Sequence, residues 1–299
     1  EFDSVIKMGR TQLQDAVPIR LGQEFHAYAS AISRDIKRFD TAKEEIRSLN
    51  MGGTAIGTGL NADSTYFHRV VKNMSSITGE ELVQSYDTID ATQNLDSYAM
   101  VSGIVKSCAV NLSKMCNDLR LMSSGPRTGF CEINLPAKQN GSSIMPGKIN
   151  PVIPEVVNQV AFNIIGNDVT ITMAAEAGQL ELNAFEPIIF YNLFESIQTL
   201  SNAVQTLVDN CIVGITANEE HCREMVEGSI GIITAICPYV GYETAANIAK
   251  EALRTNNSVR DLILQKKLLT EEQLKTILDP YTMTKPGIQG RNPADLLAD

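Results

Sequence analysis

The sequence predicts an all-α protein, with a bundle of long helices followed by a small C-terminal helical module. Two observations support this fold class. Apolar residues recur in alternating steps of four and three over long stretches, which places them along one side of a helix. Alternation with a period of two, which is the pattern of a half-buried strand, is scarce. We therefore expect long helices to form most of the structure.

Three stretches carry the helical stripe. The chain from Glu1 is expected to lie essentially inside the first long helix, and Pro187 is expected to open a helix over 188–213 because proline suits a first helical turn. Many residues beside the stripes are small or weakly polar, so we expect burial on several sides, through packing against other subunits. The stripes consist of Leu21, Phe25, Tyr28 and Ile32; of Val101, Val105, Cys108, Leu112, Met115, Leu119 and Met122; and of Leu193, Ile197, Leu200, Val204, Leu207 and Cys211.

The character of the sequence changes after about residue 216. We expect a bundle domain over 1–216 and a small helical domain over 217–299. The second domain should contain short helices at 243–254, 259–267 and 271–278, the last of them opened by a capping box of Thr270 and Gln273. The tail beyond Asp279-Pro280 is expected to be a loop.

Composition narrows the class of protein. Of 299 residues, 43% are apolar and 20% are charged, which is ordinary for a soluble globular protein. The net charge of −10 argues against a nucleic-acid-binding surface. We find no signal peptide and no apolar run long enough to cross a bilayer, so we expect a cytoplasmic protein without a membrane partner. The six cysteines lack C-x-x-C spacing and are expected to be reduced, and the three histidines predict no metal site.

The densest group of reactive residues lies at 141–151, which reads Gly-Ser-Ser-Ile-Met-Pro-Gly-Lys-Ile-Asn-Pro. A helix is expected to start just behind it, at Pro154-Glu155. Such a loop can offer hydrogen-bond donors to a carboxylate while keeping a hydroxyl free to react. A phosphate-binding Walker A loop does not fit, because five residues rather than four separate Gly141 from Gly147 and Ile149 follows the lysine. An ordinary glycine-rich loop with an exposed lysine is the other alternative.

A second glycine-rich stretch superficially matches a dinucleotide-binding fingerprint, at Gly57-x-Gly59-x-x-Ala62. The fingerprint requires a buried strand before it. The preceding segment, 42–49, is charged and helix-like. We therefore expect a turn that joins bundle helices.

The motif at 141–150 resembles the signature G-S-S-x-M-P-x-K-x-N of the aspartase/fumarase superfamily, whose members eliminate a group from succinyl-type substrates to release fumarate. The resemblance covers practically the whole chain and includes 52–59, 123–127, 154–159 and 174–180. It implies that the bundle is of the aspartase/fumarase type. It also implies a homotetramer whose active sites are composed from three subunits. No organic cofactor is implied, and activation by a divalent cation cannot be read from the residues.

Within the superfamily, the chain is most similar to the aspartase branch, the aspartate ammonia-lyases. Gln12 follows Thr11 where fumarases typically carry histidine, and Pro151-Val152-Ile153-Pro154-Glu155 is also aspartase-like. The resemblance therefore implies reversible elimination of ammonia from L-aspartate to give fumarate. Fumarate hydratase is the main alternative; argininosuccinate and adenylosuccinate lyases are less similar.

The resemblance assigns roles to eight residues. Ser142 matches the serine that acts as the base, through an aci-carboxylate intermediate, and Lys148 and Asn150 match residues that hold the substrate carboxylate, with Lys148 also favouring the serine alkoxide. Ser143 is expected to donate to the reacting carboxylate. The remaining expectations are that Thr11 and Gln12 contact substrate, that Met145 packs to fix the loop and that Glu155 supports the site from the helix start.

Interpretations without a catalytic role also remain for three of these residues. Thr11 and Gln12 could be a helix cap or ordinary surface residues, and Glu155 could simply favour the helix dipole. Members of the superfamily usually have a long additional N-terminal region whose motifs are not found here, so we expect a fragment or one part of a split enzyme. A non-catalytic, oligomerising helical core is the alternative from a different functional class.

Overall fold

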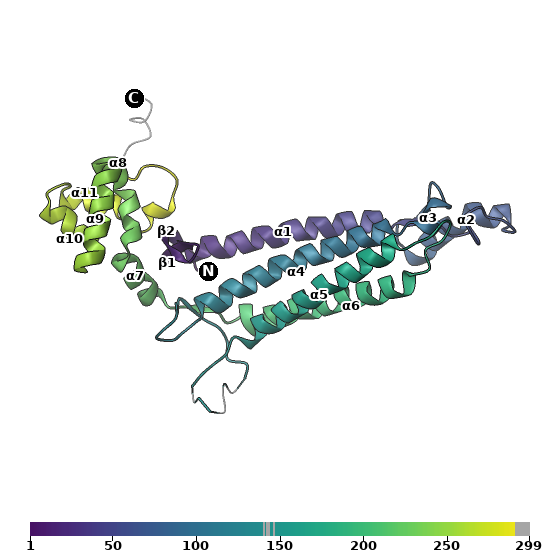
Figure 1. Cartoon of the computed structure of the whole chain (residues 1–299), viewed down its shortest axis with the longest axis horizontal. Coiled ribbons are helices and arrows are strands. Elements are labelled where there is room, and N and C mark those ends of the chain that lie inside the picture. The colour runs from purple at the N-terminus through teal and green to yellow at the C-terminus, as the bar shows by residue number, and fades with distance from the viewer. Residues whose placement is uncertain (140, 142–143, 146, 291–299) are drawn as a thin grey trace, which may run out of the picture. The chain divides into compact units, whose positions relative to one another are not determined.

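The computed structural model describes residues 1–139, 141, 144, 145 and 147–290. Its described part is mainly helical, which confirms the predicted fold class (Figure 1). The chain divides into two units. The first contains Glu1–Tyr28, Met122–Asn134 and the chain from Thr216 onward, and the second contains Ala29–Leu121 and Leu135–Ile215. The expected boundary near 216 coincides with the last of these changes, whereas the two earlier segments of the first unit had been assigned to the bundle.

Long helices make up most of the second unit. The helices are α1 (Leu21–Glu45), whose first residues belong to the first unit, α2 (Ser64–Thr78), α3 (Asp90–Gln93), α4 (Asp96–Met122), α5 (Val152–Glu176) and α6 (Glu186–Leu207), which continues as a wider turn over Val208–Ile212. The expected helices are therefore present, with Pro187 and Pro154 each in a first turn.

Both apolar and polar contacts hold these helices together. One apolar cluster brings Val101 of α4, Ile171 of α5 and Leu193 of α6 together. Buried polar groups then fix the pairing: Asp168 of α5 accepts a hydrogen bond of 2.8 Å from Ser102 of α4. Because a buried polar group is costly unless it is paired, such contacts favour one register of the helices over others.

A β-hairpin opens the chain, so the prediction that the chain begins inside a helix was wrong. β1 (Ile6–Thr11) pairs antiparallel with β2 (Gln14–Arg20), and α1 follows directly. Pro18 disfavours extension of α1 back through β2, since proline inside a helix removes a hydrogen bond and clashes with the preceding turn. Two further pairs of two-residue strands are present: β3 (Ser48–Leu49) with β4 (Val83–Gln84), and β5 (Ile133–Asn134) with β6 (Thr216–Ala217).

The first unit encloses its own apolar core. Its helices are α7 (Glu219–Gly228), α8 (Cys237–Val240), α9 (Tyr242–Thr255), α10 (Val259–Gln265) and α11 (Glu271–Ile277), with short 3₁₀-helices at Ile230–Ala235 and Thr282–Thr284. Thr270 and Gln273 form the predicted capping box. Met8 of the hairpin belongs to the same buried cluster as Ile248 and Ile263. The hairpin is therefore built into this unit.

Candidate active site

The signature loop doubles back at its ends. Gly141 has φ +69°, and a β-carbon there would lie only 2.0 Å from the carbonyl oxygen of Lys148. The two ends of the motif are therefore in contact, and only glycine allows that approach. Ser142 and Ser143, which carry the predicted base and donor, lie outside the described residues. Their roles stay predictions.

Hydrogen bonds shape the second half of the loop. The Lys148 amide donates to the Met145 carbonyl over 3.2 Å, and the Val152 amide donates to the Asn150 carbonyl over 2.9 Å. These turns lead directly into α5. The Lys148 side chain is exposed, and Met145 retains 45% of its accessible surface. Met145 is therefore not part of a packed core, and its expected role in fixing the loop stays a prediction.

Glu155 lies in the first turn of α5 and faces a cation on α4. Its Oε1 is 3.7 Å from Arg120 Nη2. Arg120 also donates to the buried Asn158 over 3.3 Å, and Asn158 in turn donates to the Ser113 carbonyl over 3.0 Å. The base of the signature loop is thus joined to α4 through a chain of polar contacts. Support from Glu155 and a favourable interaction with the helix dipole are both compatible with this position.

Thr11 and Gln12 lie in the first unit, at the tip of the β1–β2 hairpin. Thr11 pairs with Gln14, so Gln12 and Leu13 alone make the turn. Both have positive φ, 53° and 62°. Two-residue turns of this kind normally use asparagine or glycine, because other residues are strained there by about 1–3 kcal/mol each. The interpretation of Thr11 and Gln12 as a helix cap is therefore wrong, and the strained tip needs support from the residues around it.

A buried group of charges provides that support. Glu132 is 0% exposed, and its Oε1 accepts a hydrogen bond of 2.6 Å from Arg10, the residue before Thr11. Its Oε2 lies 3.1 Å from Lys7 Nζ, which also contacts Glu24 at 3.1 Å. Asp15, on the other strand of the hairpin, accepts a hydrogen bond of 2.6 Å from the Ser229 hydroxyl. The tip is thus held from both sides.

Sequence reasoning missed these supporting residues. Arg10 and Glu132 are far apart in the sequence, and their approach depends on the hairpin, which was not predicted. One signal was available: Glu132 is a charged residue in the otherwise uncharged run Gly129-Phe130-Cys131 and Ile133. A charged side chain in such a run is rarely buried without a partner.

Two of the other segments that carried the family resemblance, 123–127 and 52–59, form compact turns. In the first unit, Ser124 accepts hydrogen bonds from the Phe130 and Cys131 amides and so closes a loop that contains a cis peptide before Pro126. In the second unit, Thr88 donates to the Gly57 carbonyl over 2.6 Å. The glycine-rich stretch at 52–59 therefore lies in a connection between helices, as expected, but the short strand β3, and not a helical segment, precedes it.

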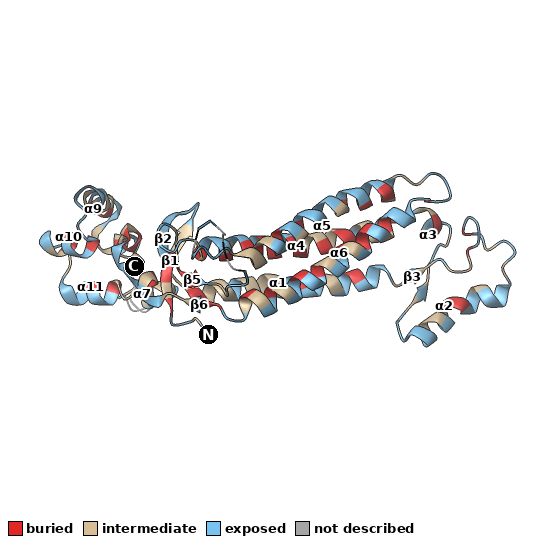
Figure 2. Cartoon of the chain, turned by 90° about the horizontal axis from the view of Figure 1, so that it is seen from below, coloured by how far each residue is buried: buried red, intermediate tan, exposed pale blue. Residues whose placement is uncertain are grey.

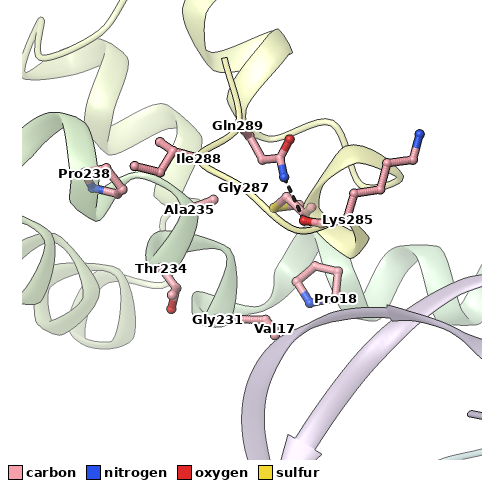
Figure 3. Close-up of a pocket in the computed structure, with 11 residues that line it drawn as sticks. Val17, Pro18, Gly231, Thr234, Ala235, Pro238, Lys285, Gly287, Ile288 and Gln289 are labelled. Atoms are coloured by element: carbon pink, nitrogen blue, oxygen red, sulfur yellow. Dashed lines mark hydrogen bonds between the residues drawn. The ribbon is translucent and has the colours of Figure 1, made fainter. Parts of the chain in front are cut away.

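A hollow of about 200 Å³ lies beside β2 in the first unit (Figure 3). Val17, Pro18 and Ala235 contribute apolar lining. Gln289 donates to the Lys285 carbonyl over 3.0 Å, and the Lys285 ammonium lies 4.4 Å from the centre of the Tyr281 ring. Two of the polar residues around this hollow, Lys285 and Gln289, are thus engaged in contacts of their own.

Two features are absent from the part of the chain that the structure describes. No group of three or more His, Cys, Asp or Glu side chains there is arranged to hold a metal ion. In the same part of the chain, no helix combines the length and the apolar character needed to cross a membrane.

Four cysteines are buried, and burial raises the pKa of each thiol. The pKa of Cys116 rises from 9.0 to about 12, and that of Cys222 rises to about 11, where the charge of Glu132 adds to the effect of burial. The other two are Cys108, whose pKa rises to about 12, and Cys211, whose pKa rises to about 11. These thiols are poor nucleophiles near neutral pH, since the thiolate is the reactive form.

Family models match both ends of the chain. One described as "Lyase" matches residues 1–166, which is more than half of the sequence, and one described as "Fumarase C C-terminus" matches residues 232–285.

Curated relatives are named aspartate ammonia-lyase. That of Bacillus subtilis (strain 168) is 58% identical over 291 residues, which cover 97% of this chain and 61% of the relative. That of Helicobacter pylori (strain ATCC 700392 / 26695) is 56% identical over 286 residues, which cover 96% of this chain and 61% of the relative. The chain thus spans about 61% of the length of these relatives.

Solved structures share the fold. The fumarate lyase:delta crystallin from Brucella melitensis bound to cobalt has a TM-score of 0.91 and 50% identity, over 95% of this chain and 62% of that one. The class II fumarase from Schistosoma mansoni has a TM-score of 0.90 and 33% identity, over 95% of this chain and 63% of that one. With a lyase model matching more than half of its residues, the chain belongs to the aspartase/fumarase superfamily of lyases.

Proposed function

We propose that this chain forms the core of an aspartate ammonia-lyase, which converts L-aspartate reversibly to fumarate and ammonia. The observation that carries the proposal is its 58% identity, over 97% of its length, to the aspartate ammonia-lyase of Bacillus subtilis. The fold alone does not decide the substrate, because a fumarase shares it with a TM-score of 0.90 at 33% identity. Gln12, where fumarases typically carry histidine, supports the same choice.

In the proposed reaction, Ser142 is the base. Its oxygen takes a proton from the carbon next to a carboxylate of aspartate, and the electrons of the broken C–H bond are held on that carboxylate as an aci form. They then form the carbon–carbon double bond as the C–N bond breaks and ammonia leaves. A serine oxygen can act this way only where preorganised donors stabilise negative charge.

The neighbouring residues of the loop supply that stabilisation in our proposal. Lys148 and Asn150 hold the substrate carboxylate, Lys148 also favours the serine alkoxide, and Ser143 donates to the reacting carboxylate. The contact between Gly141 and the Lys148 carbonyl supports this arrangement, because it keeps both ends of the short serine-containing segment together. Thr11 and Gln12 are proposed to bind the second carboxylate or the amino group without adding charge.

We also propose a homotetramer with composite active sites. Large apolar side chains are exposed along α5 and α6, among them Phe162 at 62% and Phe194 at 65% exposure. Figure 2 shows exposed residues, in pale blue, along the lengths of these helices beside the buried ones. Large apolar side chains exposed repeatedly along the same two helices support an interaction surface there. A cytoplasmic location and a reaction without an organic cofactor belong to the same proposal; activation by a divalent cation is left to experiment.

The test is fumarate formation, followed by absorbance, from L-aspartate and in parallel from L-malate. It is performed with this chain and with a fusion that adds the part of the Bacillus subtilis relative that the chain does not match. Fumarate from aspartate alone is the expected result. Fumarate from malate alone would replace the proposal with fumarate hydratase. An assembled fusion that is silent with both substrates would favour the non-catalytic core.

A further inference from the structure

The buried carboxylate of Glu132 has a position that stability alone does not explain. It meets two cations of the same strand, Arg10 Nη1 at 2.6 Å and Lys7 Nζ at 3.1 Å. The Lys7 contact lacks hydrogen-bond geometry, and among the described residues no hydrogen bond reaches Glu132 Oε2. Buried ion pairs are often no more stabilising than apolar residues of the same volume. An incompletely satisfied buried carboxylate therefore calls for another role.

An irregularity in the β1–β2 pairing lies between the two cations that reach this carboxylate. In a regular strand, side chains three positions apart point to opposite faces. The register shifts between Met8 and Arg10, however: Gly9 of β1 lies opposite two residues of β2, Ala16 and Val17, so the extra residue belongs to β2. A β-carbon on Gly9 would lie 2.6 Å from the Val17 carbonyl oxygen, so the close approach of the strands there requires glycine. Such bulges redirect side chains. Lys7 and Arg10 can then both reach Glu132, while Met8 enters the apolar core.

The segment that carries Glu132 also holds the arginine from a second direction. The Arg10 guanidinium carbon lies 4.0 Å from the centre of the Phe130 ring, and Arg10 Nη1 donates to Glu132. The Arg10 guanidinium is thus held by a hydrogen bond at one nitrogen and by an aromatic ring against its face. Because Arg10 immediately precedes Thr11, this contact acts directly on the strained tip.

We propose that Glu132 is a positioning residue for substrate binding: through Arg10 and Lys7 it fixes the hairpin tip that presents Thr11 and Gln12 to the substrate. The inference rests on the proposed function and deepens it. The strained backbone at Gln12 and Leu13 cannot hold the tip in place by itself. A misplacement of about 1 Å can cost roughly a hundredfold in rate. Removing the charge of Glu132 should therefore weaken the use of substrate without unfolding the unit.

The test compares Glu132→Gln with Glu24→Gln in the enzyme that turns over aspartate. Both substitutions keep the shape and remove one carboxylate that contacts Lys7, but only Glu132 contacts Arg10. Glu132→Gln is expected to raise KM for L-aspartate about tenfold or more, and Glu24→Gln to change it less than twofold. In combination with Gln12→Ala, Glu132→Gln should add little, because both act through the same tip. Equal effects of the two carboxylates, or a fully additive double variant, would overturn the proposal.

A second measurement does not depend on activity. Amide hydrogen exchange over residues 9–15 should become about tenfold faster in Glu132→Gln, with exchange in α9 unchanged, and should stay as in the parent in Glu24→Gln. Unchanged exchange at the tip would contradict the positioning role even if the parent proved to be inactive. An inactive parent with the predicted exchange pattern would instead contradict the proposed reaction alone. If Glu132→Gln does not fold, Arg10→Met removes the same contact and is read in the same way.

Discussion

Gly141 and Lys148 touch across the signature loop: a β-carbon on Gly141 would be 2.0 Å from the Lys148 carbonyl oxygen. This contact joins the two ends of the segment that carries Ser142 and Ser143. The loop is therefore closed by backbone contact as well as by any interaction of its side chains.

We expect Gly141→Ala to abolish turnover of aspartate. The added methyl group must displace the Lys148 carbonyl and with it the proposed carboxylate-binding residue. Gly147→Ala is the matched control, since Gly147 also has positive φ, +82°, but among the described residues nothing lies within 4 Å of a β-carbon placed there. That control should show only about 1 kcal/mol of backbone strain. Steady-state kinetics together with far-ultraviolet circular dichroism would separate the two, and equal activities would show that the contact is dispensable.

Ser142→Ala should lower kcat by a factor of about a hundred to ten thousand, the range for losing a positioned base. Assembly should stay intact, as judged by native mass spectrometry. Ser76→Ala, on the exposed face of α2, is the control and should leave kcat unchanged. Near-normal turnover of Ser142→Ala would remove Ser142 from the role of base.

Lys148→Ala should weaken both substrate binding and turnover. The loss of a cation beside the proposed alkoxide raises the free energy of the anionic transition state as well as that of the bound carboxylate. We expect kcat/KM to fall at least a hundredfold, with Lys72→Ala on α2 as a control of equal charge change. Unchanged kinetics would make Lys148 an ordinary surface lysine.

Gln12→His should increase the side activity that adds water to fumarate. The substitution gives the hairpin tip the residue that fumarases typically carry there. Gln14→His places the same side chain across the same turn and should have no such effect. Hydration and amination of fumarate, measured separately, give the preference. An unchanged ratio would show that Gln12 does not discriminate between the two leaving groups.

The buried thiols predict loss of stability at alkaline pH. A folded-state pKa raised above the unfolded value of about 9 keeps a thiol protonated in the native protein while it ionises in the unfolded chain. The contribution of each buried thiol to stability is therefore fully present below pH 9. Above pH 9 the folding equilibrium constant falls by up to tenfold per pH unit for each such thiol, and for Cys116 this continues until the folded-state pKa of about 12 is reached. The denaturant concentration at the unfolding midpoint should decrease between pH 8 and pH 10, and this decrease should be smaller in Cys116→Ala than in Cys237→Ala. The second variant is the control, because it changes a half-buried cysteine.

The sequence could predict the helices because their periodicity is local. The stripe from Val101 to Met122 lies on α4, the stripe from Leu193 to Cys211 lies on α6 and its continuation, and Thr270 with Gln273 begins α11. The hairpin could not be predicted in the same way. Its turn at Gln12 and Leu13 has neither glycine nor asparagine, so the usual local signal is absent.

The sequence by itself therefore determined the fold class, the long helices α1, α4, α5 and α6 and the short helices α9, α10 and α11, because each depends on neighbouring residues. It also located the signature motif, because that motif is long and specific. Only the tertiary structure decided that Thr11 and Gln12 lie at a strained tip, that Glu132 contacts Arg10 and Lys7 beside that tip and that Gly141 meets Lys148. The physical reason is that buried charge pairs and close backbone approaches join residues distant in the chain. A sequence contains those residues but not the distance between them.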